Sequence, residues 1–283
     1  MLLFSAVVAG SFTLGSMMAR DIDPVALTAL RFLIATFVLG GVALATTGVP
    51  TSALRAPWRY AVLGALFALY FVMMFEGLKT ARPVPASAVF TLVPLMAGGF
   101  GWMISRQAMT RRMLIGLVIG ALGATWVIFR GDLAALMAFD VGRGEAIYFI
   151  GCVSHAIFTP MARKLNRGEP AVIFSLGMLI TGFVILTVVG WSEIRATRWL
   201  ELSVLVWFTI FYLALFASAL TFVLLQYATV RLPSAKVLAY TYLTPSWVMI
   251  LELLVGNGAP PLMVGTGVAL TVVALLVLLK NEG

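Results

Sequence analysis

Residues 85–94 read PASAVFTLVP and residues 233–245 read PSAKVLAYTYLTP. Each segment begins with a proline followed by small residues, and each contains a second proline within an apolar run. The second segment follows the first by 148 residues at the first proline and by 151 at the second. A proline inside a helix removes one backbone hydrogen bond and displaces the carbonyl four residues earlier. The two segments therefore predict interrupted helices at equivalent places in two halves of the chain.

Further pairs of segments keep this displacement with small gaps. They are residues 18–20 with 161–163, Pro24 with Pro170, and residues 111–116 with 260–265. We therefore predict two homologous repeats, residues 1–140 and residues 141–283.

The composition is that of a membrane protein. Of the 283 residues, 62% are hydrophobic and 11% are charged, whereas a soluble domain is roughly half apolar and about a quarter charged. A membrane helix needs roughly 20 mostly apolar residues. Apolar runs predict ten spans, at residues 2–18, 25–46, 58–78, 85–104, 113–129, 146–161, 171–191, 202–227, 235–255 and 262–279.

Five spans in each repeat are an odd number, so the second copy must insert upside down. The predicted fold is an all-α membrane protein with ten transmembrane helices in two inverted five-helix repeats. This architecture is typical of transporters that hold the substrate near the midplane between the repeats.

Loop charges predict the orientation. With the N-terminus inside, the inner loops hold 11 Lys and Arg and the outer loops hold seven. This bias favours cytoplasmic termini in a multi-pass membrane protein. Asp140 and Glu193 are then expected outside. The apolar N-terminal segment lacks the basic residues of a secretion signal. Although the net charge is +8, we do not expect the protein to bind nucleic acid.

Catalytic and metal chemistry have little support in the sequence. One cysteine and one histidine cannot make an internal disulfide or a multi-histidine metal site. Zinc-protease, serine-hydrolase and phosphate-loop motifs are missing. We therefore expect a non-enzyme without cofactor or metal. Cys152 and His155, three residues apart, are the one candidate pair for an intramembrane enzyme, and they lack an evident third partner.

Several short motifs carry a family resemblance. They are Gly10-Ser11-Phe12, Pro24 with Leu30-Arg31-Phe32, Pro94, Pro245, and the glycine-rich fifth and tenth spans. Over essentially its whole length the chain resembles the drug/metabolite transporter superfamily, in its ten-helix branch of paired EamA domains. The resemblance implies an inner-membrane exporter of small metabolites, often amino acids. The aromatic-rich interior is similar to the aromatic amino-acid exporters, although the segment before the first span is unusually short.

Two ionisable side chains are candidates for substrate binding. His155 lies roughly 15 Å into the sixth span, near the midplane, where ionisable groups face the protein interior or water. A neutral histidine bonded to a neighbouring helix is the alternative. Lys79, near the outer end of the third span, either attracts a substrate carboxylate or pairs with Glu76. Arg31, in the second span, is expected to bond carbonyls freed at helix breaks.

Aromatic side chains and methionine supply the remaining candidates. A cavity wall would give the polar atoms of tyrosine and tryptophan a partner, and methionine would adapt to varied shapes. Ordinary helix packing is the alternative for such stripes. The candidates are Tyr70, Met74, Phe90, Tyr212, Phe216, Tyr240 and Trp247.

Pro94 and Pro245 are candidates for gating. They are expected to free the carbonyls of Phe90 and Thr241, and Thr241 itself joins the substrate-binding set. Because unpaired carbonyls inside a membrane are tolerated only against protein or a wet cavity, spans four and nine are predicted to flank the pathway. A simple kink is the alternative.

The sequence thus predicts a secondary transporter that exports amino acids, including aromatic ones, through a cavity enclosed by spans one, three, four, six, eight and nine. The alternatives are a multidrug or other metabolite exporter, a passive channel and, remotely, an intramembrane enzyme. The predicted partners are small-molecule substrates and the lipid bilayer. A GxxxG motif at Gly116 and Gly120 leaves a monomer or a weak homodimer open.

Overall fold

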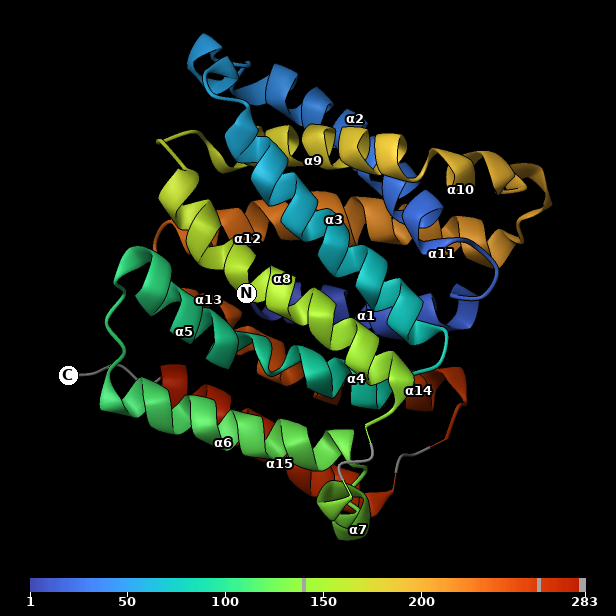
Figure 1. The fold of residues 1–283 in the computed structure, drawn as a ribbon, viewed down its shortest axis with the longest axis vertical. Coiled ribbons are helices and arrows are strands. Elements are labelled where there is room, and N and C mark those ends of the chain that lie inside the picture. Colours follow the sequence, from blue (N-terminus) through green and yellow to red (C-terminus); the bar gives the residue numbers. More distant parts are fainter. Residues whose placement is uncertain (139–140, 259–260, 280–283) are drawn as a thin grey trace.

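The computed structural model describes residues 1–138, 141–258 and 261–279, so Asp140 and Pro260 lie outside the described residues. Within these ranges all regular structure is helical (Figure 1). The unbroken long helices are α1 (Leu2–Met18), α2 (Pro24–Thr46), α3 (Trp58–Leu78), α6 (Arg111–Ile128), α8 (Arg143–Leu165), α9 (Ala171–Val189) and α15 (Leu262–Leu279).

Three further spans are divided. The fourth consists of α4 (Pro83–Phe90) and α5 (Val93–Ser105). The eighth consists of α11 (Val204–Ala214), the π-helical segment η3 (Leu215–Leu220) and α12 (Thr221–Thr229). The ninth consists of α13 (Ser234–Leu238), the 3-10 segment η4 (Ala239–Leu243) and α14 (Thr244–Val255).

Most spans are long enough to cross a membrane. Nine in the described part of the chain meet that length and apolarity, and α1 is an apolar helix of 17 residues. The predicted spans agree with these helices to within a few residues. Pro24 begins α2, where it removes no helical hydrogen bond, and the Asp23 carboxylate accepts from the Val25 N–H at 2.8 Å. Such a cap satisfies a free amide at the helix start.

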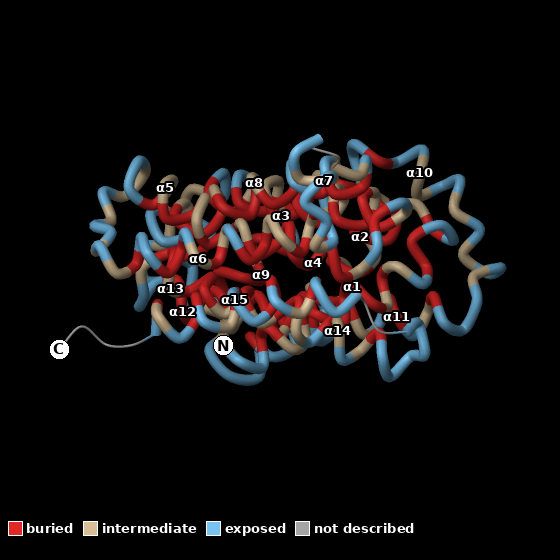
Figure 2. Tube along the Cα trace, turned by 90° about the horizontal axis from the view of Figure 1, so that it is seen from below, coloured by how far each residue is buried: buried red, intermediate tan, exposed pale blue. Residues whose placement is uncertain are grey.

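The short helices η1 (Thr51–Leu54), α7 (Leu133–Met137), α10 (Trp191–Ala196) and η2 (Trp199–Glu201) lie between spans. The sequence analysis did not predict them. We call the end of the bundle where α1 begins and α15 ends the terminal face, and the end that carries α7 and α10 the opposite face (Figure 1). Figure 2 shows the buried residues concentrated in the interior of the bundle.

Spans that hold the same place in the two halves pack against each other. The helix α6 packs on α15 and α2 packs on α9, while α5 meets α13 and α4 meets α14. The first part of span four thus contacts the last part of span nine, so the two spans run antiparallel. A Cβ on Gly123 would lie 2.7 Å from the carbonyl oxygen of Gly267, and one on Gly267 would lie 2.8 Å from that of Gly123. Glycine at both positions permits this close approach of α6 and α15.

The GxxxG motif is also used within the chain. A Cβ on Gly116 would meet Leu278 of α15 at 2.8 Å, and one on Gly120 would collide with the ring of Tyr242 in η4. Both glycines therefore accommodate neighbours of the same chain.

Candidate functional site

A small cavity lies at mid-depth between α1, α3, α4, α8, η3 and α12. Its volume is about 20 Å³, which is room for about one water molecule. All of its lining side chains are buried. They are Phe4, Val8, Ser11, Phe67, Tyr70, Phe71, Met74, Phe90, His155, Ala217, Thr221 and Leu225. Spans one, three, four, six and eight contribute to this wall as predicted, but span nine does not.

His155 lies among aromatic rings in this wall. Its ring centroid is 4.6 Å from that of Tyr70, 5.1 Å from Phe67 and 5.5 Å from Phe90. The side chain is 2% exposed, and neither ring nitrogen has a hydrogen-bond partner among the described residues. A buried polar atom without a partner is costly, so His155 can both donate to and accept from a molecule in the cavity.

Four of the ten predicted substrate-binding residues come together here. They are Tyr70 and Met74 of α3, Phe90 at the end of α4, and His155 of α8. Tyr70 also shares a hydrogen bond of 3.2 Å with the hydroxyl of Tyr148.

Lys79, Tyr212 and Trp247 lie elsewhere. The Lys79 ammonium donates to Glu76 at 2.6 Å and is 31% exposed, so the ion-pair alternative describes the structure. The Tyr212 hydroxyl donates to the carbonyl of Val7 at 2.8 Å, between α11 and α1. The Trp247 Nε1–H donates to the Ser5 Oγ at 3.2 Å. Each polar atom thus has a partner away from the cavity.

Phe216, Tyr240 and Thr241 do not line the cavity either. Phe216 is 47% exposed and shares the outward side of span eight with Phe208 and Phe211, whereas Ala217 and Thr221 line the wall. Tyr240 packs with the separate cluster around α6 and α15, and Thr241 is buried in η4. The predicted aromatic stripe of span eight thus faces away from the cavity.

Pro94 and Pro245 hold equivalent positions next to the breaks of spans four and nine. Each is the second residue of the helix that follows the break, α5 and α14 respectively. There a proline costs no helical hydrogen bond. The predicted interruptions of spans four and nine are present, but the Thr241 carbonyl is not free, because it accepts from the Thr244 N–H. Their gating role stays a prediction.

Sequence reasoning missed Phe67 and Phe71. Phe67 contacts Phe158 and Phe222, with ring centroids 4.2 and 4.3 Å apart. Extending the pair of Tyr70 and Met74 back by one helical turn would have found Phe67, since residues three and four apart share a helix face. The wall residues of η3 gave no such signal.

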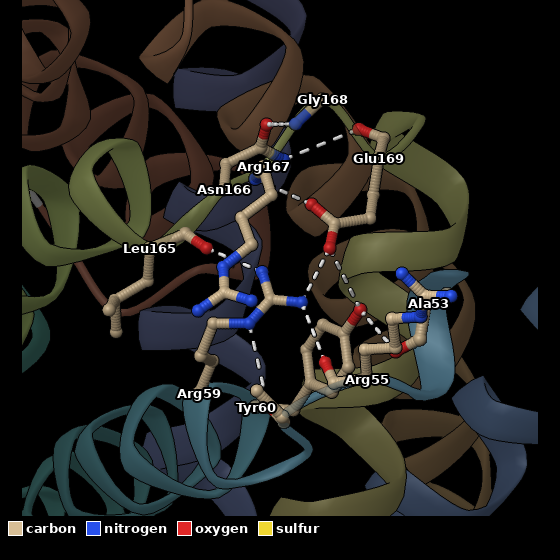
Figure 3. A network of polar contacts seen from close by, with 10 residues as sticks. Ala53, Arg55, Arg59, Tyr60, Leu165, Asn166, Arg167, Gly168 and Glu169 are labelled. Carbon is tan, nitrogen blue, oxygen red and sulfur yellow. Dashed lines mark hydrogen bonds and ion pairs between the residues drawn. The ribbon is translucent and has the colours of Figure 1, made fainter. Parts of the chain in front are cut away.

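A second polar network lies at the terminal face (Figure 3). The Arg59 guanidinium at the start of α3 donates to the Glu169 carboxylate at 2.6 Å and to the carbonyl of Leu165 at 2.6 Å. The Tyr60 hydroxyl donates to the carbonyl of Ala53 at 3.0 Å. Both charged side chains of the pair are almost fully buried. The network thus holds the α8–α9 loop against the start of α3.

Hydrogen bonds set the charge state of Glu169. Burial alone would raise the pKa of its carboxyl, but donation from Arg59 and from the Arg167 N–H outweighs burial. The pKa therefore lies below its ordinary value of 4.5, which keeps the ion pair intact at neutral pH.

The pair Cys152 and His155 shows no hydrogen bond of a nucleophile to a base. Cys152 is buried, and the His155 nitrogens accept nothing from it in the described structure. Nucleophilic catalysis normally requires that contact.

Comparisons with known proteins agree with this architecture. The sequence model of the EamA-like transporter family matches residues 1–129 and again residues 142–280. "Uncharacterized transporter YyaM" of Bacillus subtilis (strain 168) is 25% identical over 90% of this chain and 84% of its own length. "Uncharacterized transporter YetK" of the same organism is 23% identical over 87% and 76%. A crystal structure with 19% identity has a TM-score of 0.73 and covers 98% of this chain and 94% of its own, which shows a shared fold.

Proposed function

Because the chain belongs to the EamA-like transporter family, we propose that it is a secondary carrier. Its proposed substrates are small metabolites, including aromatic and other amino acids, which it exports across the inner membrane. The observation that carries the proposal is the mid-depth cavity in which aromatic rings surround a histidine whose two nitrogens find no partner in the described part of the chain. An amino acid presents the complementary groups, since its polar atoms can pair with His155 and an aromatic side chain can pack on the rings.

The cavity must enlarge to admit such a substrate. Ligand pockets typically measure about 300–1,000 Å³, and this one measures about 20 Å³. Two of its lining residues stand beside irregular helical segments, because Phe90 ends α4 before the break and Ala217 belongs to η3. Such interruptions are where helices of a bundle bend, and we propose that they allow the wall to open.

Alternating access would follow from an inverted repeat. The antiparallel packing of span four on span nine supports this symmetry. At the opposite face Arg20 Nε donates to the carbonyl of Lys79 at 3.0 Å, and at the terminal face Arg163 Nη1 donates to the carbonyl of Leu232 at 3.1 Å. Arg20 and Arg163 occupy equivalent positions in the two repeats. Each of these hydrogen bonds joins two spans of the same repeat, namely spans one and three or spans six and eight. We propose that these pairs of spans move apart in turn, so that one closure breaks at a time.

Flux of labelled amino acids into liposomes that contain the purified protein tests the proposal. A carrier is expected to saturate and to exchange internal for external substrate, whereas a channel would conduct current across a bilayer. His155→Ala should lower the flux of every amino-acid substrate, because a polar group left unpaired in an apolar setting costs roughly 2–7 kcal/mol.

Phe216→Ala is the matched control for His155→Ala, since it truncates a ring outside the cavity. Wild-type flux in His155→Ala would assign that residue to helix packing. A wild-type protein that moves no amino acid would refute the proposed substrate class.

A further inference from the structure

Arg31 is a fully buried cation that forms no ion pair with a carboxylate within the described ranges. Its Nε donates to the Ser218 Oγ at 2.9 Å and its Nη2 donates to the carbonyl of Ala217 at 2.9 Å. The guanidinium carbon lies 3.8 Å from the centroid of the Phe71 ring. The expected bonds to carbonyls at a helix irregularity are present, since Ala217 belongs to η3, but they do not neutralise the charge.

The guanidinium lies directly behind the cavity wall. Phe71 and Ala217 both contact it, and both also line the cavity. Its Nη1 is buried and has no hydrogen-bond partner in the described part of the chain. One layer of side chains therefore separates an unsatisfied cationic donor from the cavity.

The wall itself offers no negative charge. Its polar members are Ser11, Tyr70, His155 and Thr221, and none of the lining residues is acidic. In a low-dielectric interior, interactions between charges are much stronger than in water. A carboxylate in the cavity would be attracted by Arg31, whereas an ammonium group without a carboxylate would be repelled and would find no counter-ion.

We propose that the carrier selects substrates that bear a carboxylate, with Arg31 as the counter-charge, and excludes organic cations that lack one. The proposal rests on the proposed function in one respect, namely that the cavity is the substrate site. It goes beyond that function because it assigns the charge of the substrate and separates carboxylates and zwitterions from cationic compounds. Arginine suits this role because it keeps its charge when buried and presents several donors to a carboxylate.

Three labelled compounds that share a phenyl ring test the selection. L-Phenylalanine carries both charged groups, 3-phenylpropionate carries the carboxylate alone, and phenethylamine carries the ammonium alone. Flux into liposomes with the purified protein, and the shift of its melting temperature in detergent, are measured for each. The two compounds with a carboxylate are expected to be moved and bound, and phenethylamine is expected to be moved and bound far more weakly.

The outcomes separate this inference from the proposed function. Transport of 3-phenylpropionate without transport of phenylalanine would refute amino-acid export and would support the role of Arg31. Transport or binding of phenethylamine equal to that of 3-phenylpropionate would overturn the inference, and so would a response to none of the three.

Variants at Arg31 show whether the guanidinium supplies the selection. Arg31→Gln should lower the ratio of 3-phenylpropionate flux to phenethylamine flux by about tenfold or more, as expected when an opposite charge near a low-dielectric cavity is removed. Arg31→Lys should keep part of that ratio. A purely structural role would lower all fluxes equally and leave the ratio unchanged, which would contradict the inference.

Phe71→Leu keeps the test decisive if Arg31→Gln does not fold. It leaves the charge in place and removes the ring between the guanidinium and the cavity. The ratio is expected to rise in this variant, and a fall would contradict the proposal.

Discussion

At the scale of single residues, Phe67 of α3 is one of the aromatic rings that line the cavity and pack on His155. Phe67 is buried, and Phe216 lies on the exterior of the bundle. Aromatic pairs contribute about 0.5–1.5 kcal/mol beyond the area they bury. Phe67→Leu should therefore lower the flux of aromatic amino acids roughly 2- to 10-fold more than the flux of alanine.

The comparison of large and small substrates is made within one variant, so the folded yield cancels. Phe216→Leu, the same substitution outside the cavity, should leave the ratio unchanged. Equal losses for phenylalanine and alanine in Phe67→Leu would remove the aromatic ring from substrate selection.

The second residue-scale prediction concerns Glu169 and acid. Because its pKa is lowered in the folded protein, its ion pair with Arg59 stabilises the fold above the ordinary glutamate pKa of 4.5. That contribution is lost as the pH falls through the lower folded value. The melting temperature in detergent should therefore decrease below pH 4.5, and Glu169→Gln should weaken this dependence.

At neutral pH Glu169→Gln should also destabilise the protein, since it leaves a buried guanidinium without its counter-ion, which typically costs about 3–5 kcal/mol. Glu201→Gln is the matched control, because Glu201 pairs with Arg198 at 3.2 Å on an exposed surface. Exposed pairs contribute about 0–1 kcal/mol. Equal melting temperatures for the two variants would show that the buried pair is not a structural anchor.

At the scale of elements, the breaks in spans four and nine make Pro94 and Pro245 informative. Each proline stands in the first turn after a break, so replacing it by alanine removes no stabilising contact of the backbone. It does let the helix extend across the break. Pro94→Ala and Pro245→Ala should therefore reduce flux more than they reduce the yield of folded protein, measured together by transport and size-exclusion chromatography.

Pro160 is the control proline, since it lies inside the continuous helix α8. Pro160→Ala should restore a helical hydrogen bond and raise stability. Parallel losses of flux and yield in the two break variants would assign both prolines to structure alone.

At the scale of the whole molecule, the sequence was sufficient for the spans because apolar length and turn residues act locally. It also placed Tyr70 and His155 in the wall, since helical spacing and depth are local properties. It failed at Phe216, because the aromatic side of span eight faces outward while the small residue Ala217 lines the wall. It could not predict the pairing of Arg59 with Glu169, because residues far apart in sequence meet only after the spans have packed.

The last prediction concerns the orientation of the chain in the membrane. Arg167 precedes α9 at the terminal face and Glu193 follows it at the opposite face. The excess of Lys and Arg in the loops of the terminal face favours the cytoplasm for that side. The single native cysteine, Cys152, is buried and should react little. In intact cells a membrane-impermeant maleimide should therefore label Glu193→Cys, and it should label Arg167→Cys only after permeabilisation. The reverse pattern would invert the orientation, so that the opposite face, with the closure at Arg20, would lie in the cytoplasm. Labelling of both variants from one side would mean that α9 does not cross the membrane.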